Sequence, residues 1–392
     1  MRRLLVSLLA PLAATPAALK AQSAVTDTAG FVSTLGADTV AVERFVQTHD
    51  SVYGEAIARS PTTRRLVYSA RFDPDGYVKS YTLMRLTSAT DAKSPPALRF
   101  TVDFRNDSAY VKVRNGDSTT TQTLPAPRNT IPTAEPTFGL IEVMAERGVA
   151  AHGSPAAFAM YYPGGTADPA TAISRANGDS VWIESATDTV RAKVDAHGRL
   201  LGAADPGGTF QAVVTRIPPP DLNRWAADYS ARDASGRALG ALSPRDTVRG
   251  TAGRAHILVD YGRPTKRGRV IFGNVVPWNT VWRTGANAAT TLVVDHDVLL
   301  GTTRLPAGTY TVFSVPAPTS WTLVVSRKTG EWGTEYDSTS DFARIPMRAA
   351  TSSAPVERFT IAIEPKGPDA AVLTFSWDKV VARLPIRSGD KG

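Results

Sequence analysis

Arg283 and Asn287 are the residues whose types and spacing best suit ligand binding. They lie four apart in WRTGAN, residues 282–287. A guanidinium beside an amide can hold a carboxylate, a sulfate or a sugar hydroxyl through planar hydrogen bonds. Gly285 between them permits unusual backbone angles or the close approach of another group. The alternative is structural: Arg283 pairs with an internal acid, Asn287 caps a turn and Trp282 is core.

A basic run just before this loop would add an anion-attracting rim. Its cations are Arg263, Lys266, Arg267 and Arg269. Clustered cations attract anions, although a basic turn such as Lys266-Arg267-Gly268 is usually just solvated. We include Arg263, Lys266 and Arg269 in the candidate ligand-binding site.

Five tryptophans fall in the second half of the chain: Trp278, Trp282, Trp321, Trp332 and Trp377. Exposed tryptophans on a β-sheet can stack on sugar rings, but Trp321 and Trp377 alternate with polar residues like inward-facing core positions. Trp278 and Trp332 stand beside turns, and we predict that one of them forms an apolar wall of the site.

Histidines and carboxylates give the chain its remaining candidates for chemistry: His256, His296, Asp260, Asp295 and Asp297. These are zinc-ligand types. Their spacing matches no standard site, however, and Asp295-His296-Asp297 suits a polar hairpin turn. We predict no metal and no cofactor.

Hydrolase signatures are missing from the sequence. It contains no G-x-S-x-G, no H-E-x-x-H and no phosphate-binding glycine loop. A non-catalytic binding module for an anionic or carbohydrate-like ligand is therefore the favoured hypothesis. An envelope-polymer hydrolase with Asp260, His256 or His296 in acid–base roles is the competing one. A purely structural envelope protein is the third.

The N-terminus predicts export. Arg2 and Arg3 precede an apolar stretch at 4–19, as in a secretory signal, and cleavage is expected after Ala21. The chain has no cysteine, which excludes disulfides, thiolate ligands and a lipid-modified cysteine. A disulfide-free exported chain fits a bacterial periplasmic or secreted protein. No later segment approaches the ~20 apolar residues of a membrane span.

The net charge of the chain limits the kinds of binding partner that can be expected. Losing Arg2, Arg3 and Lys20 with the signal would leave 41 basic against 36 acidic residues. Nucleic acid is not expected as a partner outside the cytoplasm, whereas an anionic ligand remains open. The sequence does not specify an oligomeric state.

Turn residues and alternating apolar positions divide the chain into β-rich parts. We predict an all-β protein with a signal at 1–21, a flexible leader at 22–39, an antiparallel β domain at 40–216, a Pro-rich linker at 217–242 and a β-sandwich or jelly roll at 243–392. The first β domain reads as a meander with one helix at 138–147, ended by Gly148. Such a curved sheet can hold an apolar ligand. The alternative is that the helix fills the interior of the sheet and leaves no ligand site.

Hairpins are predicted where polar turns separate apolar runs. The turns are 73–76 (between 65–72 and 77–86), 105–107 (between 98–103 and 108–114) and 295–297 (between 291–294 and 298–300).

Several motifs of the second half resemble a known family. RPTKRGRVIFGNVVPWNTVWRTGANAATT, LPAGTYTVFSVP and the later EWG with Tyr336-Asp337 agree in order and spacing with a family of exported bacterial domains, domain of unknown function 2911. The resemblance covers about residues 243–386. Trp278-Asn279 stands where the family more often has Tyr-Gly, and Ala288 where an acid is common. The resemblance implies location and fold, and no activity.

Overall fold

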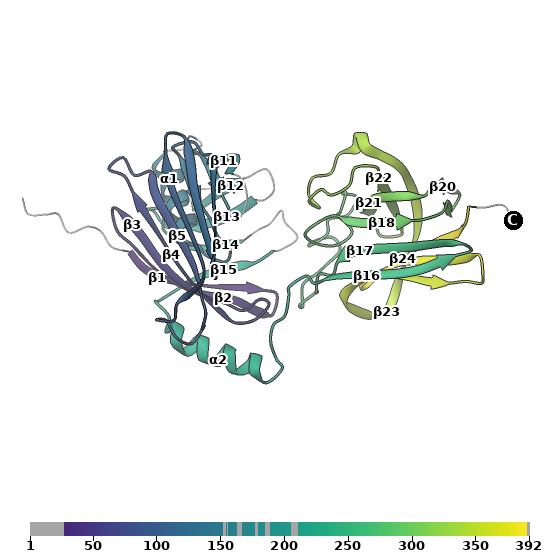
Figure 1. The fold of residues 1–392 in the computed structure, drawn as a ribbon, viewed down its shortest axis with the longest axis horizontal. Helices are drawn as coiled ribbons and strands as arrows, with labels where there is room; N and C mark the ends of the chain where they lie inside the picture. The colour runs from purple at the N-terminus through teal and green to yellow at the C-terminus, as the bar shows by residue number, and fades with distance from the viewer. Residues whose placement is uncertain are drawn as a thin grey trace, which may run out of the picture.

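The computed structural model describes residues 27–389 apart from 152–153, 155, 163–166, 177–178, 185–188 and 205–210. The predicted signal at 1–21 therefore lies outside the described residues. The described chain is mostly β, with two sheets and two α-helices (Figure 1). This confirms the all-β prediction. Neither α-helix is both long and apolar enough to cross a membrane.

The first sheet is a fifteen-stranded, almost wholly antiparallel sheet made of two meanders. Its order is β8-β7-β6-β5-β4-β3-β2-β1-β15-β14-β13-β12-β11-β10-β9. The strands are β1 (Asp27–Leu35), β2 (Asp38–Gln47), β3 (Ser51–Ala58), β4 (Arg64–Phe72), β5 (Val78–Leu86), β6 (Pro96–Arg105), β7 (Ser108–Asn115), β8 (Ser118–Pro125), β9 (Thr130–Pro132), β10 (Ala156–Tyr161), β11 (Ala167–Ala176), β12 (Ser180–Glu184), β13 (Thr189–Val194), β14 (Leu200–Ala204) and β15 (Val213–Ile217). The meanders join where β1 pairs with β15, with Gly30 opposite Ile217.

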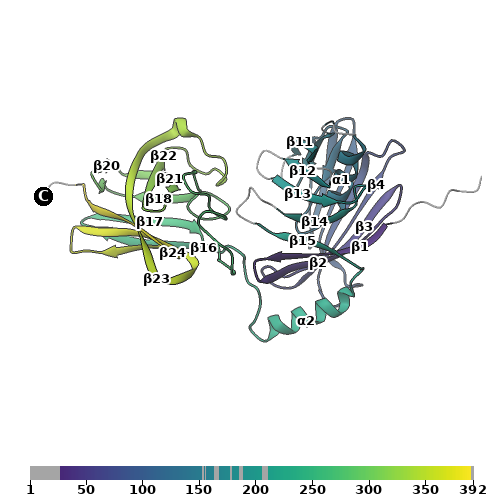
Figure 2. The ribbon, with the colours of Figure 1, turned by 180° about the vertical axis from the view of Figure 1, so that it is seen from behind.

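Helix α1 (Gly139–Ala150) packs inside this curved sheet, where a helix was predicted at 138–147. The predicted end at Gly148 is wrong, because the helix continues through Gly148 to Ala150. Met144 is fully buried, and the helix contacts strands of both meanders (Figures 1 and 2). The first turn of a helix leaves backbone N–H groups without intrahelical partners. Here Glu43 of β2 accepts hydrogen bonds from the backbone N–H groups of Phe138 and Gly139, at 2.6 and 3.2 Å. A buried carboxylate thus caps the helix from the sheet.

Helix α2 (Leu222–Ala234) lies within the predicted linker, just after three prolines. Asp221 caps it by accepting hydrogen bonds from the N–H groups of Asn223 and Arg224. Its apolar side packs on the first sheet, where Leu222 and Tyr229 join a cluster with Val42 and Ile57. The segment after β15 is therefore attached to β2 and β3, and only then continues to the second sheet.

The second sheet has nine strands in the order β16-β17-β18-β21-β22-β23-β24-β19-β20. They are β16 (Arg245–Ala252), β17 (Ala255–Gly262), β18 (Thr290–Val294), β19 (Val298–Leu300), β20 (Thr303–Leu305), β21 (Gly308–Pro316), β22 (Ser320–Ser326), β23 (Asp341–Pro365) and β24 (Ala370–Ser388), with a short 3-10 turn η1 (Ser338–Ser340) before β23. The sheet folds over so that β16 packs against β23 and β24, in a sandwich-like arrangement. Trp321 and Trp377 are buried in its core, as predicted.

Two of the three hairpin predictions named above are confirmed. The 73–76 turn joins the paired strands β4 and β5, and Asn106 and Asp107 turn between β6 and β7 with positive φ angles. The third is wrong. β18 pairs with β17 and β21, while β19 pairs with β20 and β24. The Asp295–Asp297 segment thus connects strands in different parts of the sheet, because long-range pairing decides where β19 lies.

Candidate functional site

The WRTGAN loop is an irregular segment between β17 and β18, anchored by its tryptophan. Trp282 is buried and stacks on Trp377, with ring centroids 5.9 Å apart and planes 18° apart. Phe359 meets Trp282 edge-on at 4.9 Å. Aromatic contacts of this kind hold a ring rigidly. The backbone next to Trp282, including Arg283, is therefore positioned by the core of the second sheet.

Gly285 is needed for close packing and not for an unusual φ. A Cβ there would lie 2.9 Å from the carbonyl oxygen of Gly262. The left-handed residues of the loop are instead Thr284 and Asn287, with φ of 50° and 63°. A β-branched residue in that region is strained, so its surroundings must hold it. The Thr284 hydroxyl donates to or accepts from Ser314 at 2.9 Å, and Thr290 donates to the Thr284 carbonyl at 2.8 Å.

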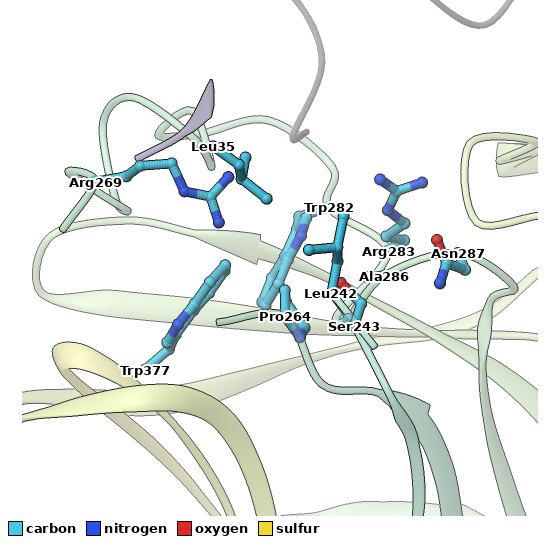
Figure 3. Close-up of a pocket in the computed structure, with 11 residues that line it drawn as sticks. Leu35, Leu242, Ser243, Pro264, Arg269, Trp282, Arg283, Ala286, Asn287 and Trp377 are labelled. Atoms are coloured by element: carbon cyan, nitrogen blue, oxygen red, sulfur yellow. The ribbon is translucent and has the colours of Figure 1, made fainter. Parts of the chain in front are cut away.

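A cleft of about 70 Å³ opens beside this loop, at the junction with the first sheet. Arg269, Arg283 and Asn287 all line it, so three of the seven predicted site residues lie together (Figure 3). Trp282 and Trp377 line it as well. The spacing of Arg283 and Asn287 in the sequence predicted this neighbourhood.

Arg269 reaches the cleft from the basic turn, where backbone carbonyls hold its guanidinium. Its Nε donates to the Lys266 carbonyl at 3.0 Å, and an Nη donates to the Thr265 carbonyl at 2.6 Å. Burial, together with the nearby charge of Arg267, lowers the pKa of Arg269. An arginine remains charged under these conditions. The nearby charge of Glu357 acts in the opposite direction and raises this pKa.

Leu35 of β1 lines the cleft from the first sheet, and no signal in the sequence predicted it. Figure 3 shows it entering from the purple strand above the tryptophans. The reason is a contact between the basic turn and the β1–β2 hairpin. The amide of Ala37 donates to the Arg267 carbonyl at 3.1 Å, and the Arg267 guanidinium pairs with Asp38. Residues of both sheets thus form one cleft.

Arg263 and Lys266 bond to internal partners and do not line the cleft. Arg263 pairs with Asp246 at 2.8 Å and donates to the Phe359 carbonyl at 3.2 Å. Lys266 pairs with Asp378 at 2.5 Å. This is the structural arrangement that basic residues of a turn commonly adopt. Their role in ligand binding stays a prediction.

Neither predicted tryptophan wall lines the cleft. Trp278 is half-buried and stacks on Phe272, with centroids 5.5 Å apart. Trp332 is 48% exposed on the segment that bridges to Ala288. The walls come instead from Trp282 and Trp377, whose buried rings present one edge to the cleft.

The histidines and aspartates separate into small ion pairs away from the cleft. His256 Nδ1 lies 2.7 Å from Asp295 and His296 Nδ1 lies 3.0 Å from the same carboxylate. Hydrogen bonds from His296, and then from His256, lower the pKa of Asp295. Asp260 pairs with Arg245, and Asp297 with Arg304 at 2.6 Å. Within the described ranges, no three His, Asp or Glu side chains converge to hold a metal ion.

A comparison with known families shows which part of the cleft lies in a recognised domain. Residues 243–386 match the family described as Protein of unknown function (DUF2911). The predicted resemblance is therefore confirmed for the second sheet. The cleft lies almost wholly in this DUF2911 region, with Leu35 and Leu242 outside it. No curated protein matches the sequence.

Solved structures that are similar to part of the chain include the following two. A DUF1089 family protein from Pseudomonas aeruginosa is 14% identical, with a TM-score of 0.31, and the match covers 43% of this chain and 91% of that one. A β-barrel-like protein of domain of unknown function DUF1849 from Brucella abortus is 14% identical, with a TM-score of 0.32, and covers 49% and 95%.

Proposed function

We propose that this is an exported, non-catalytic binding protein whose junction cleft holds a small anionic group, such as sulfate or the carboxylate of an acidic sugar. One observation carries the proposal: Arg269 of the basic turn lines the same cleft as Arg283 and Asn287 of the WRTGAN loop. Two guanidinium groups and an amide are the donors best suited to a planar oxyanion.

Electrostatics supports an anion in particular. Arg267 and Arg269 lie close enough for the charge of Arg267 to lower the pKa of Arg269, in addition to the effect of burial. Two partly buried cations repel each other more strongly than they would in water. Asp38 pairs with Arg267, and the charge of Glu357 raises the pKa of Arg269, so part of this repulsion is already offset. A bound anion would offset the remaining cost of burying the Arg269 charge.

The size of the cleft limits the bound group. A cavity of about 70 Å³ has room for roughly five water-sized groups. That matches a sulfate or a carboxylate with the first atoms of a sugar. The rest of a larger ligand would extend outward past Asn287, which is exposed. The edges of Trp282 and Trp377 would supply apolar contact.

The hydrolase hypothesis finds less support. His256 lies at the start of β17 and His296 in the segment after β18, with 75% and 48% of their side-chain surfaces accessible. Neither lines the cleft, and Asp260 is engaged by Arg245 and by the hydroxyl of Thr247 at 3.0 Å. A general base must reach the proton that it removes. These residues are better explained as ion pairs that stabilise turns.

Isothermal titration of the full chain tests the proposal, because Leu35 belongs to the cleft. The probes are sodium sulfate, glucuronate and neutral glucose. Glucuronate should bind and glucose should not. Arg283→Ala should weaken glucuronate at least about tenfold, since hydrogen bonds to charged groups contribute ~1.5–3 kcal/mol. Asn287→Gly should also weaken it, because glycine keeps the φ of 63° without strain.

Arg249→Ala is the matched control, because Arg249 is an exposed arginine of β16 that does not line the cleft. It should leave the affinity unchanged. Equal losses in Arg249→Ala and Arg283→Ala would show only a general charge effect. Glucuronate and sulfate failing to bind the folded wild type would refute the proposal.

Export is tested separately by fractionating bacterial cells that express the full chain or a variant lacking residues 1–21. The full chain should be found in the periplasm or medium, shortened at its N-terminus, and the variant in the cytoplasm. Retention of the full chain in the cytoplasm would contradict export without bearing on the cleft.

A further inference from the structure

A second cavity, of about 100 Å³, lies inside the first sheet. One wall is formed by strands β1, β14 and β15. The loop leading into α1, which includes Thr133 and Phe138, forms the opposite wall together with Ile141 of the helix. The lining is predominantly apolar, unlike that of the junction cleft.

The sheet register builds this space. Ser33 of β1 lies opposite Val214 of β15, and Val214 lies opposite Ala203 of β14. Residues directly opposite each other in an antiparallel pair share one face of the sheet. Two of the three side chains in this row are among the smallest available. The row therefore leaves a hollow between the sheet and α1, where larger side chains would have filled the core.

The lining also contains a buried polar group without a partner. Thr133 is 6% exposed, and its hydroxyl has no hydrogen-bond partner among the described residues. Leaving a buried hydroxyl unpaired is costly, and such a group calls for an explanation. A polar atom of a bound molecule at this place would satisfy it.

Charge restricts what that polar atom can belong to. None of the described residues that line the cavity is a lysine, an arginine or a histidine. An anionic head group there would have no cationic side chain of the lining to pair with, and burying an unpaired charge is costly. A hydroxyl or ester carries no charge, and it could pair with the Thr133 hydroxyl.

We propose that this cavity binds the alkyl chain of a neutral single-chain amphiphile, with its hydroxyl or ester end at Thr133. Space of about 100 Å³ is less than the ~150 Å³ of a cavity that holds benzene, so it encloses the first few carbons of the chain and the rest extends from the cavity. The site is separate from the junction cleft in position, lining and charge. It does not depend on the proposed anion binding.

Titration of the full chain with 1-octanol, and with octanoate for comparison, tests this inference. 1-Octanol should bind with a negative heat-capacity change, the mark of apolar burial. Octanoate should bind more weakly, because its carboxylate would meet no cationic side chain in the described lining. Equal or tighter binding of octanoate would overturn the choice of a neutral head group.

Two variants locate the site. Ala203→Leu fills the hollow and should weaken 1-octanol at least about tenfold, as expected when ligand and side chain compete for one volume. Val213→Leu is the control, because Val213 is the 50% exposed neighbour of Val214 on the opposite face of β15, and it should bind like the wild type. Glucuronate binding should not change in either variant, which separates this test from that of the cleft.

Thr133→Val supplies an independent test if Ala203→Leu does not fold. It replaces the hydroxyl with a methyl group of similar size. Binding of 1-octanol should weaken about fivefold or more through the lost hydrogen bond, while the thermal midpoint of the unliganded protein should not fall. Wild-type affinity in a folded Ala203→Leu or in Thr133→Val would refute the proposed site, as would failure of 1-octanol to bind the wild type.

Discussion

The backbone amide of Ala37 donates a hydrogen bond to the carbonyl oxygen of Arg267, with 3.1 Å between nitrogen and oxygen. This bond joins the β1–β2 hairpin to the basic turn of the DUF2911 region. The Arg267 guanidinium adds an ion pair with Asp38. Gln211 and Asn274 make a further contact between the two parts, at 3.2 Å. The junction cleft depends on this seam, because Leu35 is only two residues from Ala37.

Gly36→Ala should disrupt the seam. Gly36 has a φ of 60°, and a Cβ there would overlap the Arg267 carbonyl. Gly116→Ala is the matched control: Gly116 turns between β7 and β8 with a φ of 57°, and nothing lies within 4 Å of its added Cβ. Both variants should lose about 1–2 kcal/mol of unfolding free energy from the left-handed backbone.

Gly36→Ala alone should also lower glucuronate affinity and speed tryptic cleavage between 217 and 243. Denaturant titration, calorimetry and timed proteolysis measure these effects. Identical behaviour of the two variants in all three would show that the seam does not support the cleft.

Glu43 should make stability depend on pH. It is 1% exposed, and burial raises its pKa from 4.5 to about 7, against the lowering effect of hydrogen bonds from Tyr68, Phe138 and Gly139. The folded state therefore holds this proton more tightly than the unfolded state. Its stabilising contribution is complete below pH 4.5 and is lost as pH rises towards 7. The shift corresponds to about 3 kcal/mol.

Urea unfolding at several pH values measures this. Glu43→Gln should flatten the fall in unfolding free energy between pH 4.5 and 7. Glu184→Gln, which alters an exposed carboxylate of β12, should keep the wild-type slope. Parallel curves for wild type and Glu43→Gln would assign the pH dependence to other groups.

Arg65 should be among the most sensitive positions of the first sheet. Its side chain is 1% exposed, pairs with Glu55 at 2.9 Å and donates to Asn223 of α2 at 2.7 Å. Arg65→Met would leave Glu55 with Arg44, at 3.3 Å, as its ion-pair partner among the described residues. The expected loss is about 3–5 kcal/mol. Asn223→Ala removes only the bond to α2 and should cost about 1.5–3 kcal/mol. Denaturant unfolding measures the loss of unfolding free energy in both variants. Equal losses in Arg65→Met and Asn223→Ala would contradict a stabilising role for the buried Arg65–Glu55 ion pair.

Lys266→Ala and Trp332→Ala should leave glucuronate affinity unchanged, although both residues were candidates by sequence. Lys266 is paired with Asp378, and neither residue lines the cleft. Arg283→Lys should weaken binding, because an ammonium group cannot form a planar pair of hydrogen bonds. Titration of the three variants checks the cleft boundary. A loss in Trp332→Ala would extend the site beyond it.

Short sequence patterns correctly predicted the features that depend on neighbouring residues. The turn at Asn106-Asp107 and a helix at 138–147 are specified by residues within a few positions, and the structure has both, although the helix continues through Gly148 to Ala150. Arg283 and Asn287 lie together because they share one short loop. The buried Trp321 and Trp377 followed from alternation along their strands.

Contacts between residues far apart in the sequence could not be predicted from local patterns. The polar segment Asp295–Asp297 has the composition of a hairpin turn, but β19 pairs with β24 near the end of the chain. Leu35 enters the cleft through a hairpin more than 200 residues before Arg267, and its own neighbours in sequence give no hint of it. Trp278 stands beside a turn, yet Phe272 covers it. Tertiary packing determines all three of these positions. It follows no periodic sequence pattern, so the sequence did not predict them.

The pairing of β1 with β15 has a consequence for the order in which the molecule is made. Gly30 must wait for Ile217 to emerge before the first sheet can close, and the cleft must wait longer, until Trp377 has been synthesised. More than nine tenths of the polypeptide must therefore be made before the proposed anion can meet its complete binding surface. A nascent or truncated chain that lacks the last cleft residue would not bind that ligand. Ligand binding would therefore distinguish chains that contain the whole cleft from shorter ones.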